Sequence, residues 1–285
     1  MGNALSQQLE FVHFYNKSDT LIVWFSAFTN GPKLAKLFKV RKTFHGYRIA
    51  RSNSDYDWLL LRENYGYTND GSYYSGTPSN YFIESQFAEI FSSLALQKKN
   101  IVFLGSSMGG YAAIKFALIH GVKKVALFSP HLDLKIARAL CGRKKWIDFL
   151  TSNTIESPSQ KDLFLKRLQI LVHQLKDNFN GMSLFIQASV DDFGVFNEQI
   201  IPFIKEVEVF KPDIFLDRRE FGGHSGLFMS DELILYVLDS LSKNQPLNAE
   251  KLRNFPNRHL RRSEKIERTL QVVENYLFRK VKGVI

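Results

Sequence analysis

One strand–turn–helix pattern constrains this 285-residue chain more than any other feature. The apolar run 101–104 leads into Gly-Ser-Ser-Met-Gly-Gly at 105–110, and a helical run follows over 111–118. A Gly-x-Ser-x-Gly turn passes so sharply from strand to helix that small residues are required on both sides of the serine. The pattern therefore predicts an exposed, reactive hydroxyl at Ser107, beside the positive end of a helix.

Two other interpretations of this turn compete with catalysis. The first is a tight structural turn without chemistry, and the second is a loop that binds phosphate. A phosphate loop of the Walker type needs Gly-Lys-Ser or Gly-Lys-Thr, whereas Gly110 is followed by Tyr111. The catalytic interpretation is favoured because two chemical partners follow the serine in chain order.

Those partners are a carboxylate and a histidine. A serine hydroxyl becomes a nucleophile only when a base takes its proton, and a carboxylate orients that base. The strand-like segment 183–188 runs into Asp191 and Asp192, and His224 lies in the Gly-rich stretch Phe-Gly-Gly-His-Ser-Gly. The order serine, aspartate, histidine is that of α/β-hydrolases. Asp191 is preferred because the chain should still be leaving its strand there, and Asp192 is the alternative.

Acyl transfer also needs N–H donors for the oxyanion of the intermediate. The first expected donor is the backbone N–H of Met108, directly after the nucleophile. The second should come from the loop after an early strand, here 21–25, so Ala27 or Phe28 is expected to supply it. Many hydrolases carry His-Gly in this loop, and Ser26-Ala27 stands in its place.

The rest of the chain alternates between strand-like and helical segments, which favours a mostly parallel sheet flanked by helices. Segments 11–15 and 21–25 are expected to pair through a short turn, and a helix is expected over 81–97. Further strands are expected at 47–50, 58–61 and 124–129. We predict one α/β domain over 1–248.

Two basic segments stand out from this domain. Residues 131–180 contain nine Lys or Arg and five Asp or Glu, and they are expected to form a helical cap inserted between two strands. Residues 249–285 contain ten Lys or Arg and four Asp or Glu, with an apolar stripe that predicts a helix over 263–280. Both segments have a plain structural interpretation as solvated helices. Their charge also suits a polyanion or an anionic membrane surface.

Composition narrows the class of protein. The single cysteine, Cys141, excludes an internal disulfide framework and a multi-cysteine metal site, and no metal is expected. No run of 18 apolar residues and no signal-peptide pattern is present, so the expected location is cytoplasmic, with peripheral membrane contact through the basic tail as a further option. No nucleic-acid recognition motif accompanies the net charge of +10.

With these residues in place, the chain resembles the α/β-hydrolase superfamily. A narrower resemblance lies in Leu-Arg-Glu at 61–63, Gly-Ser-Tyr-Tyr-Ser-Gly at 71–76, and the elbow at 105–113. These segments look like hydrolase-fold capsular-polysaccharide O-acetyltransferases of bacterial surface-polysaccharide clusters, although that group tends to have Arg-Asp at Arg62-Glu63. The resemblance implies acetyl-CoA as acyl donor and an anionic polysaccharide as acceptor.

Two classes of function follow. The first is an enzyme that forms an acyl-Ser107 intermediate, either the O-acetyltransferase or a carboxylesterase or deacetylase acting on a carbohydrate or small ester. The second is a non-catalytic hydrolase-fold scaffold in a polysaccharide or secretion assembly. A complete serine, histidine and aspartate set argues for the enzyme.

Overall fold

Seven strands form one sheet in the order β1-β3-β2-β4-β5-β6-β7. The computed structural model describes residues 9–28, 44–66, 71–140, 143–152, 157–224 and 229–255. Every neighbouring pair is parallel except β1 and β3 at one edge. The strands are β1 (Leu9–Phe14), β2 (Thr20–Phe25), β3 (Asp57–Glu63), β4 (Asn100–Ser106), β5 (Lys124–Phe128), β6 (Ser183–Ser189) and β7 (Asp213–Arg219). This confirms the predicted mostly parallel sheet.

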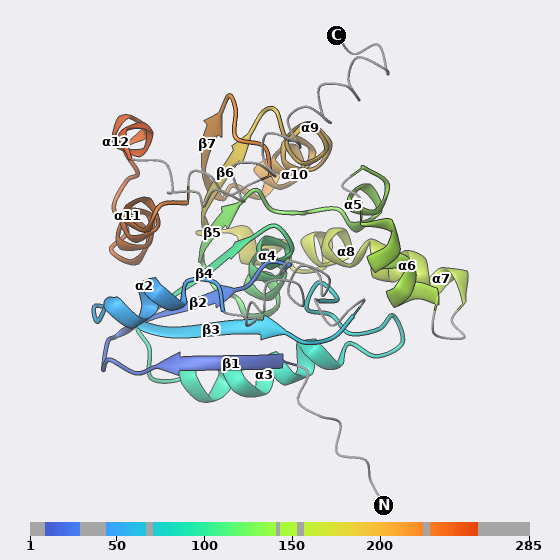
Figure 1. The fold of residues 1–285 in the computed structure, drawn as a ribbon, viewed down its shortest axis with the longest axis horizontal. Helices are drawn as coiled ribbons and strands as arrows, with labels where there is room; N and C mark the ends of the chain where they lie inside the picture. Colours follow the sequence, from blue (N-terminus) through green and yellow to red (C-terminus); the bar gives the residue numbers. More distant parts are fainter. Residues whose placement is uncertain are drawn as a thin grey trace, which may run out of the picture.

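Helices cover both faces of the sheet (Figure 1). The α-helices of the main body are α2 (Tyr47–Ser52), α3 (Phe82–Ala95), α4 (Met108–His120), α9 (Phe193–Val195), α10 (Ile201–Val207), α11 (Asp231–Ser242) and α12 (Ala249–Asn254). Shorter turns are the 3-10 helices η2 (Lys176–Phe179) and η4 (Glu208–Phe210) and the π-helix η3 (Phe196–Ile200). No helix within the described ranges is long and apolar enough to cross a membrane.

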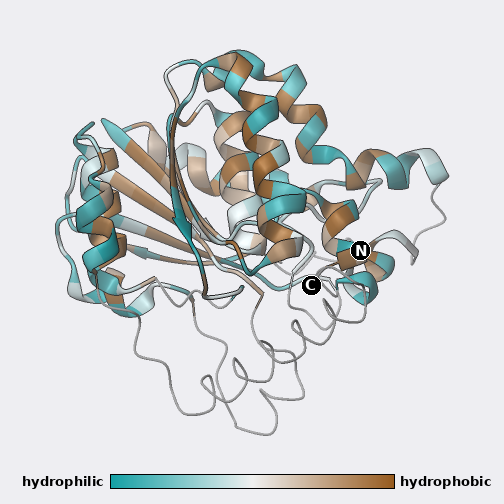
Figure 2. Ribbon diagram, turned by 90° about the horizontal axis from the view of Figure 1, so that it is seen from above, coloured by the Kyte–Doolittle hydropathy of each residue, from teal (hydrophilic) through white to brown (hydrophobic). Residues whose placement is uncertain are grey.

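Alternating side chains of the strands build two separate cores, as expected for a sheet buried on both faces. In β2, Val23 and Phe25 face the core beneath α3 and α4, whereas Ile22 and Trp24 face the core beneath α2 and α11. Figure 2 shows the largely hydrophobic strands lying between the two helical layers. The rigid sheet therefore fixes where its carboxyl ends, and the loops that follow them, lie.

The predicted helical insertion is present between β5 and β6. It contains α5 (Leu134–Leu140), α6 (Lys144–Ser152), α7 (Pro158–Leu165) and α8 (Arg167–Gln174). Its innermost helix, α8, packs on α4 through Leu168 and Leu171, while α5 to α7 extend beyond the edge of the main body (Figure 1). The insertion thus adds a helical projection beside the nucleophile helix.

The predicted pairing of the first two strands is wrong, because β3 lies between them. The connection from β1 to β2 crosses the end of β3 and does not form a hairpin. Asp57 at the start of β3 holds this crossing, since its carboxylate accepts hydrogen bonds from the backbone N–H groups of Asn16 and Ser18 at 2.8 and 3.0 Å. Lys98 pairs with the other Asp57 oxygen at 2.6 Å.

The prediction of a strand at 47–50 is also wrong, because these residues begin α2. Gly46 precedes the helix with a φ of 74°, and a Cβ at this position would lie 2.1 Å from the ring of Trp24. The left-handed turn at Gly46 reverses the chain and buries Ile49 and Ala50 on the sheet. The helix predicted over 263–280 and Cys141 lie outside the described residues.

Candidate active site

The nucleophile turn has the geometry predicted from the sequence. Ser107 adopts φ 52° and ψ −121°, a conformation that costs a residue with a side chain about 1–3 kcal/mol. A Cβ at Gly105 would lie 2.1 Å from the carbonyl oxygen of Gly109, and a Cβ at Gly109 would lie 2.1 Å from that of Phe25. Both glycines are therefore required where β4, α4 and β2 converge.

Neighbouring backbone holds this strained residue in place. The Ser107 N–H donates to the Phe128 carbonyl at 3.1 Å, and the Ser107 carbonyl accepts from the N–H of His131 at 3.0 Å. Both partners belong to the end of β5 and the segment directly after it. The adjacent strand therefore fixes the direction in which the hydroxyl points.

A continuous chain of hydrogen bonds links Ser107 to a histidine and a carboxylate. Ser107 Oγ lies 2.7 Å from His224 Nε2, and His224 Nδ1 lies 2.7 Å from Asp192 Oδ2. A carboxylate only accepts, so Nδ1 carries the proton and Nε2 is left to accept from the serine hydroxyl. The three side chains come from the β4–α4 turn, the segment after β7 and the turn after β6, all at the carboxyl edge of the sheet.

The carboxylate that meets His224 is Asp192, whereas the sequence favoured Asp191. The chain turns after β6, with the Asp192 N–H donating to the Ser189 carbonyl, and this turn directs consecutive side chains differently. Asp191 instead accepts from the backbone N–H groups of Gly222 and Gly223 at 3.1 and 2.8 Å. It therefore anchors the loop that carries the histidine.

The structure distinguishes between Ala27 and Phe28, the two residues of the loop after β2 that are expected to supply an oxyanion donor. The N–H of Ala27 donates to His45 Nδ1 at 3.3 Å, so that donor is already engaged. Phe28 is the next residue along the same loop. Met108 begins α4, and its N–H belongs to the first helical turn, where no carbonyl within the helix can accept it. With the Ala27 N–H engaged, Phe28 stays the expected donor from this loop, alongside Met108.

A second histidine, His131, was not identified from the sequence. It is fully buried, and its ring stacks on that of His224 with centroids 4.7 Å apart and planes inclined by 15°. Burial, with the nearby charges of His224 and Arg143, holds the pKa of His131 well below its ordinary value. His131 Nδ1 lies 3.1 Å from the Tyr73 hydroxyl. Its position just after β5, next to the nucleophile strand, was the available signal.

Tyr73 belongs to the segment 71–76 that carried part of the resemblance. Tyr73 and Tyr74 both have positive φ values, 56° and 54°, and are fully buried. The Tyr74 hydroxyl donates to the carbonyls of Ser26 and Leu61, which ties this segment to the loop after β2. The two tyrosines therefore support both His131 and the loop that carries Phe28.

Two buried ionisable side chains hold this segment in its strained form. Glu63 accepts from the N–H groups of Ser72 and Tyr74 at 2.7 and 2.8 Å and from the Ser72 hydroxyl. From the nucleophile helix, Lys115 donates to the carbonyls of Tyr73 and Tyr74 at 3.3 and 2.7 Å. Both side chains are buried, so hydrogen bonds that water does not reach couple the segment to β3 and α4.

Lys115 is itself paired with a carboxylate. Its ammonium lies 3.1 Å from Glu84, which also pairs with Arg167 of α8 at 2.8 Å. Burial alone would raise the pKa of Glu84, but Lys115 and Arg167 together hold it below its ordinary value. This ion cluster joins α3, α4 and the helical insertion behind the site.

We expect Glu63→Ala to lower the free energy of unfolding by ~3 kcal/mol, because three donors lose their buried acceptor. Burial raises the pKa of Glu63 from 4.5 to about 7. Between pH 4.5 and 7, the Glu63 carboxyl therefore stays protonated in the native state but is ionised in the unfolded chain. The stabilising contribution of Glu63 is therefore complete below pH 4.5 and declines as pH rises through 7. Urea unfolding should show a larger difference from the original protein at pH 5 than at pH 8. An equal difference at both pH values would contradict this assignment.

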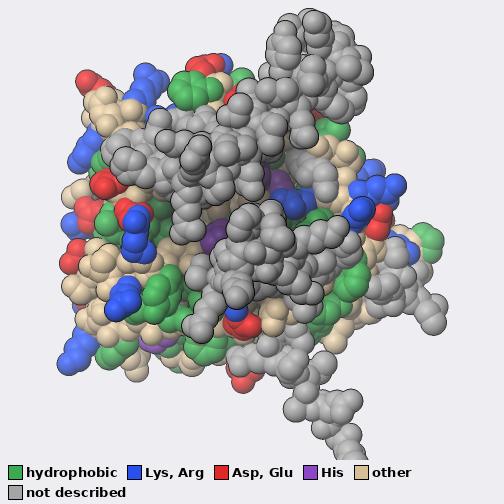
Figure 3. Space-filling model, in the orientation of Figure 1, with side chains coloured by type: hydrophobic (Ala, Val, Ile, Leu, Met, Phe, Trp, Pro, Cys, Tyr) green, Lys and Arg blue, Asp and Glu red, His purple; other side chains and the backbone are tan. Residues whose placement is uncertain are grey.

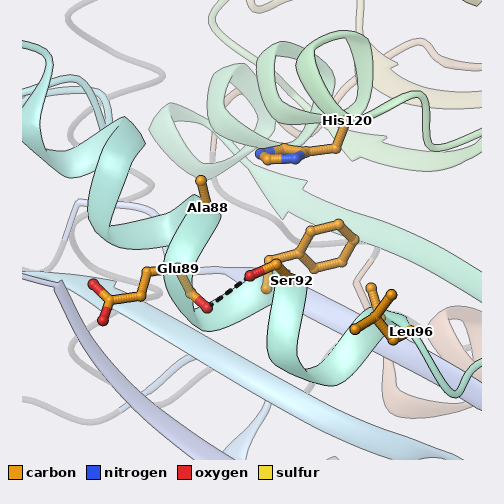
Figure 4. Close-up of a pocket in the computed structure, with 7 residues that line it drawn as sticks. Ala88, Glu89, Ser92, Leu96 and His120 are labelled. Atoms are coloured by element: carbon orange, nitrogen blue, oxygen red, sulfur yellow. Dashed lines mark hydrogen bonds between the residues drawn. The ribbon is translucent and has the colours of Figure 1, made fainter.

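An open pocket at the other end of α4 is separate from this site. It is lined by α3 residues and by His120, the last residue of α4 (Figure 4). Twelve helical steps at about 1.5 Å each place His120 roughly 18 Å from the start of the helix. Within the described part of the chain, no group of three or more His, Cys, Asp or Glu side chains is placed to hold a metal ion.

Comparison with known proteins supports the fold. No protein-family model matches this chain, and no curated protein matches it by sequence. A capsule O-acetyltransferase of Neisseria meningitidis serogroup A is similar in structure, with a TM-score of 0.63 and 17% identity over 84% of this chain and 91% of that one. A histidine-to-alanine mutant of the same enzyme in complex with CoA gives a TM-score of 0.60 at the same identity and coverage.

Hydrolases share this fold as well. Pyrococcus horikoshii acylaminoacyl peptidase matches with a TM-score of 0.58 and 15% identity, over 88% of this chain and 45% of that one. At such identities the likeness defines the architecture and leaves the activity open. The chain has an α/β-hydrolase fold, and it resembles a capsule O-acetyltransferase as well as hydrolases.

Proposed function

We propose that this chain is a Ser-His-Asp acyltransferase that O-acetylates an anionic bacterial capsular polysaccharide from acetyl-CoA. The observation that carries the proposal is the hydrogen-bonded chain from Ser107 Oγ through His224 to Asp192. Without that chain, the fold alone would fit the non-catalytic scaffold equally well.

Each residue has a defined role in this reaction. As Ser107 Oγ attacks the thioester carbonyl, its proton passes to His224 Nε2, and Asp192 stabilises the resulting imidazolium. The N–H groups of Met108 and Phe28 receive the oxyanion. When the intermediate collapses, the thiolate leaves with the proton from His224, and an acetyl-Ser107 ester remains.

In the second half of the reaction, His224 again transfers the proton, and Ser107 becomes the leaving group. An acceptor hydroxyl gives its proton to His224 Nε2 and attacks the acetyl carbonyl, and Ser107 recovers a proton as it leaves. Transfer outcompetes hydrolysis only when the acceptor is held in place and water is kept away. Ser107 is only 9% exposed, and Phe28, in the loop after β2, packs on the rings of Tyr73 and Trp146, which favours a sheltered reaction.

A panel of acceptors tests the transferase against the esterase. The protein is incubated with acetyl-CoA and with anionic or neutral capsular polymers, and new O-acetyl groups are read by NMR while free CoA is measured. The transferase predicts O-acetyl groups on an anionic polymer with matching CoA release. CoA release at an equal rate without any polymer, and no polymer acetylation, would identify an esterase.

Salt should separate binding of a polymer from chemistry. The insertion carries a net charge of +4 and the segment 249–285 carries +6, and exposed charges are screened over ~10 Å at 0.1 M salt. We expect the KM for an anionic polymer to rise several-fold between low and high salt, whereas turnover of a small neutral ester should be nearly constant. A polymer KM that does not depend on salt would indicate a neutral or small acceptor.

A further inference from the structure

Among the described residues, one cation beside the proposed site has no carboxylate partner. Arg143 lies at the junction of α5 and α6, and within the described ranges no acidic side chain pairs with it. Its buried Nε–H also has no hydrogen-bond partner. Other arginines of the insertion are paired, Arg138 with Asp148 and Arg167 with Glu84, both at 2.8 Å. A partly desolvated guanidinium without a partner costs free energy, unless a ligand supplies the missing hydrogen-bond acceptors.

Aromatic side chains hold this guanidinium in a fixed position. Its central carbon lies 4.4 Å from the ring centroid of Phe28 and 5.8 Å from that of Trp146, whose rings are themselves 4.7 Å apart. A guanidinium stacked on a ring keeps its N–H groups in the plane, where two of them can meet two oxygens of one anion. Stacking thus orients Arg143 for a bidentate contact.

Two contacts connect Arg143 to the proposed site. Phe28 is the expected oxyanion donor from the loop after β2, so Arg143 lies on the side chain of a residue that would touch the intermediate. Arg143 is also near enough to His131 to help lower the pKa of that histidine, and His131 stacks on His224. Figure 3 shows histidine and Lys or Arg side chains next to each other near the middle of the face.

Building on the proposed function, we infer that Arg143 forms a subsite for a phosphate group of a substrate. A phosphate offers the two adjacent oxygens that a guanidinium edge matches, and its negative charge suits a permanent cation that no carboxylate pairs with in the described part of the chain. Two substrates could bring such a group to the site: acetyl-CoA through its nucleotide portion, or an acceptor glycan linked by phosphodiesters. Arg143 is thus a specificity residue that no step of the triad chemistry uses.

Turnover of matched substrates tests this subsite. In Arg143→Gln, kcat/KM for acetyl-CoA should fall about 10- to 100-fold more than kcat/KM for S-acetyl-N-acetylcysteamine, a thioester without phosphate, because a charge-assisted hydrogen-bonded pair is lost. Arg143→Lys should recover only part of this loss, since an ammonium makes no bidentate contact. Arg138→Gln, which removes a paired arginine of the same insertion, should leave the ratio unchanged.

Binding supplies a readout that needs no turnover. Calorimetry with Ser107→Ala compares the affinity for CoA, and for a phosphodiester-linked oligosaccharide, with and without Arg143→Gln. A loss of about 10-fold or more for CoA alone assigns the subsite to the donor, and a loss for the oligosaccharide alone assigns it to the acceptor. Unchanged affinity for both probes would overturn the inference. So would a kcat/KM that falls equally for acetyl-CoA and for the phosphate-free thioester in Arg143→Gln.

The two proposals fail in different ways. Ser107-dependent hydrolysis of p-nitrophenyl acetate reports the triad and involves no phosphate. If that hydrolysis is absent, the proposed function fails, whereas the binding comparison still decides the role of Arg143. If hydrolysis is present and CoA and the oligosaccharide bind to Arg143→Gln as to its parent, only the phosphate subsite is lost.

Discussion

Ser107→Ala is expected to lower the rate of acetyl release from acetyl-CoA by at least ~10³-fold while the protein stays folded, because the acyl-enzyme can no longer form. His224→Ala should cause a loss of similar size, since the serine, histidine and aspartate act as one unit. Initial rates with acetyl-CoA and with p-nitrophenyl acetate measure both effects.

The neighbouring serine supplies a matched control. Ser106 ends β4 one residue before the nucleophile and lies outside the hydrogen-bonded chain to His224. Ser106→Ala should therefore keep most of the activity. If Ser107→Ala retained a rate near that of the original protein, with its circular dichroism unchanged, the assignment of the nucleophile would be wrong.

The second large effect is expected at the carboxylate. Asp192→Asn should lower the rate by about 10³- to 10⁴-fold, because an amide no longer fixes the His224 tautomer or stabilises the imidazolium. Asp191→Asn should have a much smaller effect, since an amide oxygen can still accept from Gly222 or Gly223 and hold the loop. Steady-state kinetics of the two variants, measured side by side, give the comparison. The opposite ranking would restore Asp191 as the partner of the histidine.

The nucleophile turn could be predicted because its requirements are local. Gly105 and Gly109 lie where backbone atoms approach so closely that a Cβ is excluded. The fixed spacing of these glycines around Ser107 therefore identifies the turn in the sequence. The strand before and the helix after it carry clear apolar patterns. The same locality explains why the helical insertion between β5 and β6 was recognised.

Features that depend on distant partners were missed. The first two strands were expected to form a hairpin, yet Asp57 draws the chain across the end of β3, a contact that no local pattern records. The choice between Asp191 and Asp192 depends on side-chain directions in a turn, which alternation along a strand does not define. In both cases the elements themselves are predicted correctly, and the difference lies in which strands or side chains contact each other.

Supporting residues around the site were equally hidden. His131 and Tyr73 are brought to His224 by the packing of two segments far apart in the chain. Arg143 lies within the basic segment 131–180, and its position on the rings of Phe28 and Trp146, with no carboxylate partner among the described residues, becomes visible only in the folded chain. The sequence thus indicates the candidate serine, histidine and aspartates, whereas the structure adds the residues that contact them.

The most direct test of a serine acyl-enzyme is covalent labelling with a fluorophosphonate probe followed by peptide mapping. We expect a single labelled residue, Ser107, in the folded protein. Labelling should vanish in Ser107→Ala, fall strongly in His224→Ala because the hydroxyl loses its base, and persist in Ser106→Ala. A probe that fails to label the folded protein, or that labels Ser106 and leaves Ser107 free, would contradict the central claim.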